Sequence, residues 1–312
     1  MSGVDQPPQS PEPEAEWEPG PAWEPEPEPE PGQWPVPDGP LRFAALGDSL
    51  TEGVGDPVDG AWRGWAALLA EGIASPGREV ELHNLAVSGA QTSDVLLRQT
   101  PAALALRPDI VSVVVGVNDT LRQTFDIHAV AARLDEVYGA LTARGAVLLT
   151  ACLPDPGTML GLPGVLARPL ARRQGAVNAV VHALSRRHGA VHLHAAEGDL
   201  AADRTLWSAD RLHPGERGHR VFAAGFHALL VDRGLAAGTP PAREPELPPP
   251  TRSASLWWLA TAGTGWVARR CTDLLPQLLA LAADEVRHQA RGTSGRLDVS
   301  ASHAVAAALA AL

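Results

Sequence analysis

The stretch Phe-Ala-Ala-Leu-Gly-Asp-Ser-Leu at residues 43–50 joins an apolar run to a turn of small and polar residues. A short apolar run that ends at a glycine is typical of a strand buried inside a parallel sheet. Gly47 and Asp48 favour a sharp turn, after which the chain enters a helix. We therefore expect Ser49 at the carboxyl end of a buried strand, where its hydroxyl is exposed and can act as a nucleophile if a base reaches it.

From residue 41 onward, short apolar runs alternate with helical stretches. The predicted strands are 42–47, 79–86, 109–116, 146–152 and 190–194. The predicted helices are 64–75, 93–106, 127–143, 167–188 and 216–233. This alternation indicates an α/β fold with three layers, α/β/α, around a parallel sheet. Five strands fit the flavodoxin-like order 2-1-3-4-5.

Polar residues and glycines stand at the ends of these strands. Gly89 follows the second predicted strand and Asn118 the third, while Asp210 and His213 lie on one late loop. Ligands of an open parallel sheet bind beyond the carboxyl ends of its strands. The segments that carry Ser49, Gly89 and Asn118 are therefore expected to meet at one crevice.

These residue types suit acyl transfer by a serine nucleophile. A serine hydroxyl needs an adjacent base, and His213 is the candidate that takes its proton and later passes it to the leaving group. Asp210 lies three residues before His213, close enough to accept from the other ring nitrogen and fix the tautomer. The chain contains no lysine, which excludes a Ser-x-x-Lys pair, and no Gly-x-Ser-x-Gly elbow.

The sequence resembles the SGNH (GDSL-type) hydrolase family, which is named for its Ser, Gly, Asn and His. The four residues lie in separate short blocks in the family's order: Ser49, Gly89, Asn118 and His213. The resemblance covers roughly residues 41–234. It implies a serine esterase or lipase that works through an acyl-enzyme, with an oxyanion hole made by the backbone N–H groups of Ser49 and Gly89 and the side-chain amide of Asn118. It implies no metal and no organic cofactor.

The family acts on lipid esters, acetylated sugars, thioesters and aryl esters, so the acyl and alcohol groups of a small-molecule ester substrate stay open. Transfer of the acyl group to an acceptor other than water would use the same site. A scaffold or interaction protein built on an SGNH core is a third reading. An intact set of catalytic residues argues against it.

The chain divides into four parts by composition. Residues 1–40 form an acidic tail rich in Pro and Glu that we expect to be disordered. Residues 41–234 form the hydrolase domain, residues 235–255 a Pro-rich linker, and residues 256–312 a C-terminal helical segment. Trp17, Trp23 and Trp34 in the tail are interpreted as incidental, the alternative being anchors for an unknown protein partner.

Charge and hydropathy exclude several functions. Of the formal net charge of −11, the first 40 residues account for −10, which leaves −1 on the rest and no basic field for nucleic acid. The N-terminus lacks the basic and apolar regions of a signal peptide, and the apolar stretch 256–268 is too short to span a bilayer. With two cysteines distant in sequence, these features favour a cytoplasmic protein.

Three further interpretations concern secondary features. An apolar stripe between Leu274 and Val286 is expected to dock on the hydrolase domain; a partner surface, or peripheral membrane contact through residues 256–291, is the alternative. The loop 154–166 is expected to line an acyl pocket or to act as a lid, with walls from Trp62, Trp65 and Trp207; ordinary packing of a mobile loop is the alternative. His192 and His194 alternate on a strand, but because no third ligand is evident we expect no metal site there.

Overall fold

The computed structural model describes residues 39–74, 78–197, 203–208, 210–236, 238–246 and 278–312. Most of residues 1–40 and the stretch 256–268 lie outside the described residues, and so do Trp17, Trp23, Trp34, Leu274 and Leu275. Among the helices of the described part, none is both long and apolar enough to cross a membrane.

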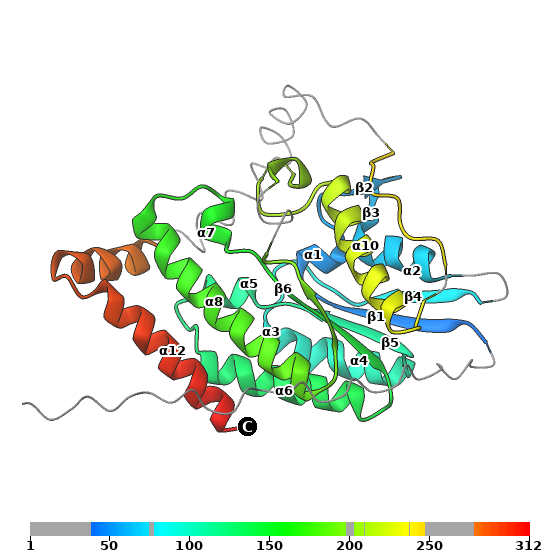
Figure 1. Ribbon diagram of the computed structural model, residues 1–312, viewed down its shortest axis with the longest axis horizontal. Coiled ribbons are helices and arrows are strands. Elements are labelled where there is room, and N and C mark those ends of the chain that lie inside the picture. Colours follow the sequence, from blue (N-terminus) through cyan, green and yellow to red (C-terminus); the bar gives the residue numbers. More distant parts are fainter. Residues whose placement is uncertain (1–38, 75–77, 198–202, 209, 237, 247–277) are drawn as a thin grey trace, which may run out of the picture. The chain divides into compact units, whose positions relative to one another are not determined.

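A five-stranded parallel sheet forms the centre of the fold, in the order β4-β1-β5-β6-β7 (Figure 1). In chain order this is 2-1-3-4-5, so the predicted flavodoxin-like arrangement is confirmed. The strands are β1 (Leu41–Gly47), β4 (Val80–Asn84), β5 (Ile110–Val114), β6 (Val147–Cys152) and β7 (Val191–His194). Each lies within two residues of the predicted bounds.

Helices cover both faces of the sheet because alternate side chains of each strand point to opposite sides. Ala44 and Leu46 of β1 belong to the core under α6 (Ile127–Thr142) and α8 (Gly164–Arg187). Phe43 and Ala45 belong to the core under the helices of the opposite layer, which are α2 (Gly64–Ile73) and α10 (Glu216–Asp232). Strands buried on both faces have continuous apolar sequences, which is the pattern that predicted them.

Shorter elements connect these layers. They are α1 (Ser49–Glu52), β2 (Pro57–Val58), β3 (Ala61–Trp62), α3 (Thr92–Asp94), the π-helix η1 (Val95–Gln99), α4 (Thr100–Leu106), α5 (Val117–Thr120), α7 (Pro156–Met159) and the 3₁₀ turn η2 (Arg204–Leu206). The predicted helix 93–106 is thus divided by a π-helical turn. Such turns occur most often near functional sites.

The second core contains a cluster of aromatic rings. Trp65 of α2 is fully buried, with its ring centroid 5.2 Å from that of Phe222 and 5.1 Å from that of Phe226. Tilted and offset pairs at this separation add to the stabilisation that burial itself provides. The expectation that Trp65 lines the acyl pocket is therefore wrong, because its indole ring belongs to the interior.

Two arginines, of which Arg63 is half-buried and Arg220 buried, hold the segment that follows α10. Arg63 pairs with Asp56 at 3.0 Å and with Glu216 at 3.0 Å, and Arg220 pairs with Glu216 at 2.9 Å. Both guanidinium groups also pair with Glu246. The part of the predicted linker around Glu246 therefore contacts α2 and α10.

The C-terminal helix α12 (Ser294–Ala310) packs on α6 and α8. Ala308 is 2% exposed and belongs to the same core as α6, with Val305 and Leu309 packed against it. Residues 278–290 are helical too, but Leu279 and Val286 of the predicted apolar stripe are exposed. In the described part, α12 packs on the hydrolase domain, and the helix 278–290 contacts α8 through the ion pair of Glu285 with Arg172 at 3.2 Å.

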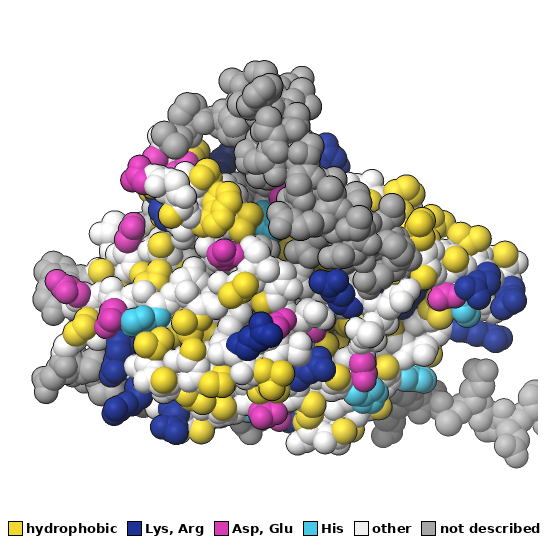
Figure 2. Space-filling view, turned by 180° about the vertical axis from the view of Figure 1, so that it is seen from behind, with side chains coloured by type: hydrophobic (Ala, Val, Ile, Leu, Met, Phe, Trp, Pro, Cys, Tyr) yellow, Lys and Arg dark blue, Asp and Glu magenta, His cyan; other side chains and the backbone are white. Residues whose placement is uncertain are grey.

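Charged side chains of both signs are interspersed on the face drawn in Figure 2. Hydrophobic side chains are scattered among them. Mixed charge of this kind is typical of a solvated surface.

Substitution of Ala308 by arginine tests the packing of α12. We expect Ala308→Arg to lower the free energy of unfolding by about 1–3 kcal/mol, because it forces a long charged side chain into a filled core. The measurement is chemical denaturation of the full chain. Ala307→Arg is the matched control, since Ala307 is exposed on the same helix and its replacement should leave stability unchanged. Equal stability of the two variants would contradict the docking of α12.

Candidate active site

The turn that carries Ser49 depends on glycine at position 47. Gly47 has a φ of +151°, and a Cβ atom there would lie 2.3 Å from the carbonyl oxygen of Val114. Gln99 fixes the same residue from the other side: its Oε1 accepts from the N–H of Gly47 at 2.8 Å, and its Nε2 donates to the carbonyl at 2.9 Å. The close approach of β1 and β5 thus fixes where the chain leaves the sheet.

Asp48 caps the short helix α1 from inside the protein. Its Oδ1 accepts from the N–H of Leu50 at 3.1 Å, and its Oδ2 accepts from Nδ2 of Asn118 at 3.0 Å. The side chain is buried, and burial raises the pKa of Asp48 from 3.8 to about 6. Its hydrogen bonds and the nearby His213 act in the opposite direction. The sequence analysis interpreted Asp48 as shaping the turn, which agrees with its capping bond.

Ser49, His213 and Asp210 form a continuous chain of hydrogen bonds. The Oγ atom of Ser49 lies 2.7 Å from Nε2 of His213, and Nδ1 of the same ring lies 2.6 Å from Oδ2 of Asp210. Ser49 is 164 residues from His213 in sequence, so the fold creates this contact. A nucleophile, a base and a group that orients the base are thereby aligned.

The carboxylate of Asp210 is held in its ionised form. Burial alone would raise its pKa, but the hydrogen bond and charge of His213 outweigh burial and bring the pKa of Asp210 well below its usual value. Oδ1 accepts three more bonds, from Oγ of Ser208 at 2.7 Å and from the N–H groups of Leu212 and His213 at 2.9 and 3.0 Å. A carboxylate bound in this way keeps the Nδ1 proton on the imidazole and stabilises a positive ring.

Of the two other predicted oxyanion donors, Asn118 lines the same cavity as Ser49, and Gly89 lies on a loop that contacts α1. Asn118 is buried beside Ser49, and its amide nitrogen donates to Asp48 and, at 3.1 Å, to the carbonyl of Ala90. Gly89 has a φ of +84°, a conformation that favours glycine. The adjacent Ser88 donates from its N–H to Glu52 of α1 at 2.7 Å, so α1 holds the Gly89 loop in place.

An apolar cavity of about 60 Å³ opens beside Ser49 and His213. On this scale one water needs about 10–15 Å³, so the cavity has room for roughly four atoms of that size. Its apolar walls are Leu50, Val117, Leu153, Pro154, Pro156, Met159, Trp207 and Leu212. The loop after β6 lines this cavity as predicted, and so does Trp207, whereas Trp62 is not among its walls.

The sequence analysis missed three residues that support the site. Gln99 holds Gly47, Glu52 holds the Gly89 loop, and Ser208 holds Asp210. Each is a polar residue on a different turn or helix, and nothing in its local sequence distinguishes it from a solvated side chain. The contacts only emerge when the fold is formed.

A family model describes more than half of the chain. The model of the GDSL-like Lipase/Acylhydrolase family matches residues 45–221, a range that includes Ser49, Gly89, Asn118, Asp210 and His213. The chain belongs to this family.

Relatives of this GDSL-like chain with assigned names are esterases. It is 30% identical over 205 residues to the GDSL-like esterase Rv1075c of Mycobacterium tuberculosis, covering 62% of either chain. It is 29% identical over 105 residues to an arylesterase of Vibrio mimicus, covering 34% of this chain and 50% of the relative. The chain thus spans between half and two thirds of the length of these two relatives.

Solved structures share the fold of this GDSL-like chain. The acetylxylan esterase Axe2 of Geobacillus stearothermophilus superposes with a TM-score of 0.50 at 20% identity, over 62% of this chain and 94% of Axe2. LAE5, an alpha/beta hydrolase from the metagenome of Lake Arreo, gives a TM-score of 0.51 at 22% identity, over 66% of this chain and all of LAE5. At this identity the likeness concerns the fold.

Asp48 makes the stability of the fold depend on pH. Because its pKa is raised to about 6 on folding, the folded state binds more protons than the unfolded state between pH 4 and 6, and stability falls as the pH rises through this range. Relative to Asp48→Asn, the wild type should gain up to about 3 kcal/mol of unfolding free energy when the pH falls from 8 to 4. The measurement is denaturation of both proteins across this range.

Asp232→Asn is the matched control for the Asp48 experiment. Asp232 is exposed at the end of α10, so the same chemical change there should leave the unfolding free energy close to that of the wild type. A pH-independent difference between the wild type and Asp48→Asn would show that Asp48 is not a buried acid with a raised pKa.

Proposed function

We propose that this protein hydrolyses carboxylic esters with short acyl groups through an acyl-enzyme on Ser49. The observation that carries the proposal is the hydrogen-bond chain from Ser49 through His213 to Asp210, with distances of 2.7 and 2.6 Å, at the wall of an apolar cavity. Membership of the GDSL-like lipase/acylhydrolase family supports ester hydrolysis as the reaction.

In the first half of the reaction, Oγ of Ser49 attacks the ester carbonyl carbon while its proton passes to Nε2 of His213. Asp210 stabilises the resulting imidazolium through Nδ1. The carbonyl oxygen becomes an oxyanion, for which the backbone N–H groups of Ser49 and Gly89 and the amide of Asn118 are the donors. The intermediate collapses, His213 returns the proton to the leaving oxygen, and an alcohol and an acyl-Ser49 ester result.

In the second half, water replaces the alcohol. Nε2 of His213 takes a proton from the water, whose oxygen attacks the acyl carbon, and the same donors stabilise the second oxyanion. Collapse breaks the bond to Oγ of Ser49, which recovers its proton from His213. The products are a carboxylic acid and the free enzyme.

The amide of Asn118 has to change partners to donate to an oxyanion. One of its N–H groups points to Asp48 and the other to the carbonyl of Ala90. Because Asp48 has a raised pKa, its hold on the amide weakens when it is protonated. A donor shared in this way strengthens its bond to the substrate only as negative charge develops, which favours the transition state over the ground state.

Replacement of Ser49 or His213 by alanine tests the mechanism. We expect each variant to lose at least about 10⁴-fold in kcat on p-nitrophenyl acetate, because the residues act as a unit and neither works alone. The measurement is the initial rate with the folded state checked by circular dichroism. Ser302→Ala, an exposed serine on α12, is the control that should keep full activity. Substantial turnover by Ser49→Ala would exclude Ser49 as nucleophile.

The size of the cavity predicts a preference among acyl chains. Its volume of about 60 Å³ favours acetyl to butyryl esters, so kcat/KM should fall for longer p-nitrophenyl esters. Met159→Ala removes a wall of the cavity and should move the optimum to longer chains, with a rate gain of roughly 10-fold or more for each methylene or two that is newly accommodated. Leu97→Ala, at an exposed leucine, is the control. If kcat/KM depends on acyl chain length in Met159→Ala as it does in the wild type, this cavity is not the acyl pocket.

A further inference from the structure

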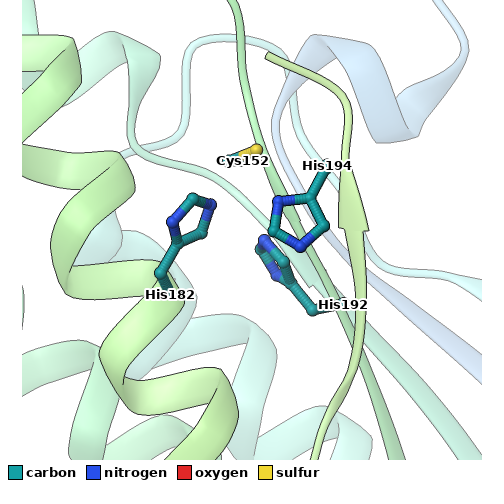
Figure 3. Close-up of side chains that lie close together, drawn as sticks. All are labelled: Cys152, His182, His192 and His194. Atoms are coloured by element: carbon teal, nitrogen blue, oxygen red, sulfur yellow. The ribbon is translucent and has the colours of Figure 1, made fainter. Parts of the chain in front are cut away.

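Four potential metal ligands converge outside the active site. They are Cys152 at the end of β6, His182 on α8, and His192 and His194 on β7, and one ligand atom from each lies within 4.8 Å of the others. Figure 3 shows the three imidazole rings turned toward one another between α8 and β7, with Cys152 beside them. None of Ser49, Asp210 and His213 belongs to this cluster.

The three rings are arranged around a common centre rather than stacked. The ring centroids of His182 and His192 are 4.7 Å apart, those of His182 and His194 are 5.0 Å apart, and those of His192 and His194 are 4.8 Å apart. Two of the three pairs are close to perpendicular, at 83° and 90°. Nearly equal separations at steep angles allow one nitrogen of each ring to point to the same place.

The ring of His192 is held in the orientation that a metal ligand needs. Its Nδ1 atom lies 2.9 Å from Oγ1 of Thr150, which in turn lies 2.7 Å from Oγ of Ser185. Its Nε2 atom is buried and has no hydrogen-bond partner among the described residues, and the same is true of Nε2 of His182. A ligating histidine donates its second ring N–H to such an outer partner, which fixes its tautomer.

One carboxylate and one guanidinium act on the charge of the cluster. Among the charged neighbours, Glu197 favours positive charge and Arg186 opposes it. The N–H of Ala196 donates to Sγ of Cys152 at 3.5 Å, and the thiol in turn lies 3.8 Å from the carbonyl oxygen of Leu193.

We propose that Cys152, His182, His192 and His194 form a tetrahedral site for one Zn²⁺ ion. One sulfur and three imidazole nitrogens are a donor set that zinc prefers, and four protein ligands are typical of a structural site. Tetrahedral Zn²⁺ with bond lengths of about 2.0–2.3 Å holds its ligands about 3.3–3.6 Å apart. Since the ligand atoms lie within 4.8 Å of one another, they have to approach by at most about 1.2–1.5 Å to reach these separations. His194 is exposed, which gives the ion a way in.

Binding of the ion has two consequences for this chain. The thiol of Cys152 loses its proton to solvent as the Zn–S bond forms. The ion then joins β7, the last strand of the sheet, to β6 and to α8. A bound ion that is absent from the unfolded state stabilises the fold, so stability should increase with the concentration of Zn²⁺.

The test is a metal titration of the full chain without an affinity tag. The protein is stripped with a chelator, dialysed, and titrated with Zn²⁺ by calorimetry and with Co²⁺ by absorption spectroscopy. We expect one Zn²⁺ per chain, and a Co²⁺ complex with the visible bands of tetrahedral cobalt and a near-ultraviolet thiolate band. Cys152→Ser should lose the thiolate band, and Zn²⁺ should raise the melting temperature of the wild type.

His194→Ala is the decisive variant, because its exposed side chain can be removed without a cavity in the core. It should weaken Zn²⁺ binding at least 10-fold and abolish the rise in melting temperature. His128→Ala is the matched control, since His128 is an exposed histidine outside the cluster. If the wild type takes up no Zn²⁺ at micromolar concentration, or if His194→Ala binds as the wild type does, the proposal is wrong.

Thr150→Val tests the outer partner of His192. Loss of such a hydrogen bond typically weakens metal binding by roughly 10–100-fold, and we expect this range for Zn²⁺ while the stoichiometry stays at one. The metal-free variant should keep the melting temperature of the metal-free wild type within a few degrees. Zn²⁺ affinity equal to that of the wild type would remove Thr150 from the site and would show that His192 is not held through Nδ1.

Discussion

The contact between Gly47 and Val114 is the constraint on which the rest of the site depends. Only a residue without a side chain lets β1 turn away at the point where it lies against β5, since a Cβ atom would approach the Val114 carbonyl to 2.3 Å. The turn delivers Ser49 to the edge of the sheet, and β5 delivers Asn118 to the same edge. The nucleophile and one of its oxyanion donors are thus positioned by a single close approach of two backbones.

Burial of polar groups is the second constraint on this site. Asp48, Asn118 and His213 are all buried, and a buried polar group is costly unless it is hydrogen-bonded. Each finds its partners within the site: Asp48 and Asn118 bind one another, and His213 is held between Ser49 and Asp210. Because these bonds are shared, removal of one member leaves another unsatisfied. The hydrogen-bonded arrangement is therefore formed before any substrate arrives.

The fold could be predicted from the sequence because its central strands, β1, β5 and β6, are buried on both faces. Continuous apolar runs such as Phe43–Leu46 allow few other interpretations, and the glycine or polar residue that ends each run marks the carboxyl edge of the sheet. The same reasoning placed Ser49, Gly89 and Asn118 at one crevice. The distance between Ser49 and His213 required the fold itself, because no local pattern specifies a contact across 164 residues.

The sequence did not predict contacts between segments whose local patterns do not indicate a partner. The sequence analysis expected Trp65 to line the acyl pocket, but its ring packs against the rings of Phe222 and Phe226 in the core. His192 and His194 lacked a third ligand in the sequence because His182 precedes them on a helix, and Cys152 lies on a different strand. Helical and strand periodicities do not reveal which face of a helix will pack on which face of a strand. That pairing is determined by the tertiary fold.

The boundary of the family match is not the boundary of the unit that folds. The match ends at residue 221, yet Arg220 is 3% exposed and donates to the carbonyl of Ala242 as well as pairing with Glu246. A fragment that stopped at the end of α10 would keep this buried guanidinium and lose two of its acceptors. The residues around Ala242 and Glu246 thus pack as part of the same folded unit as the sheet, and a fragment designed to retain these contacts has to extend past the end of the family match.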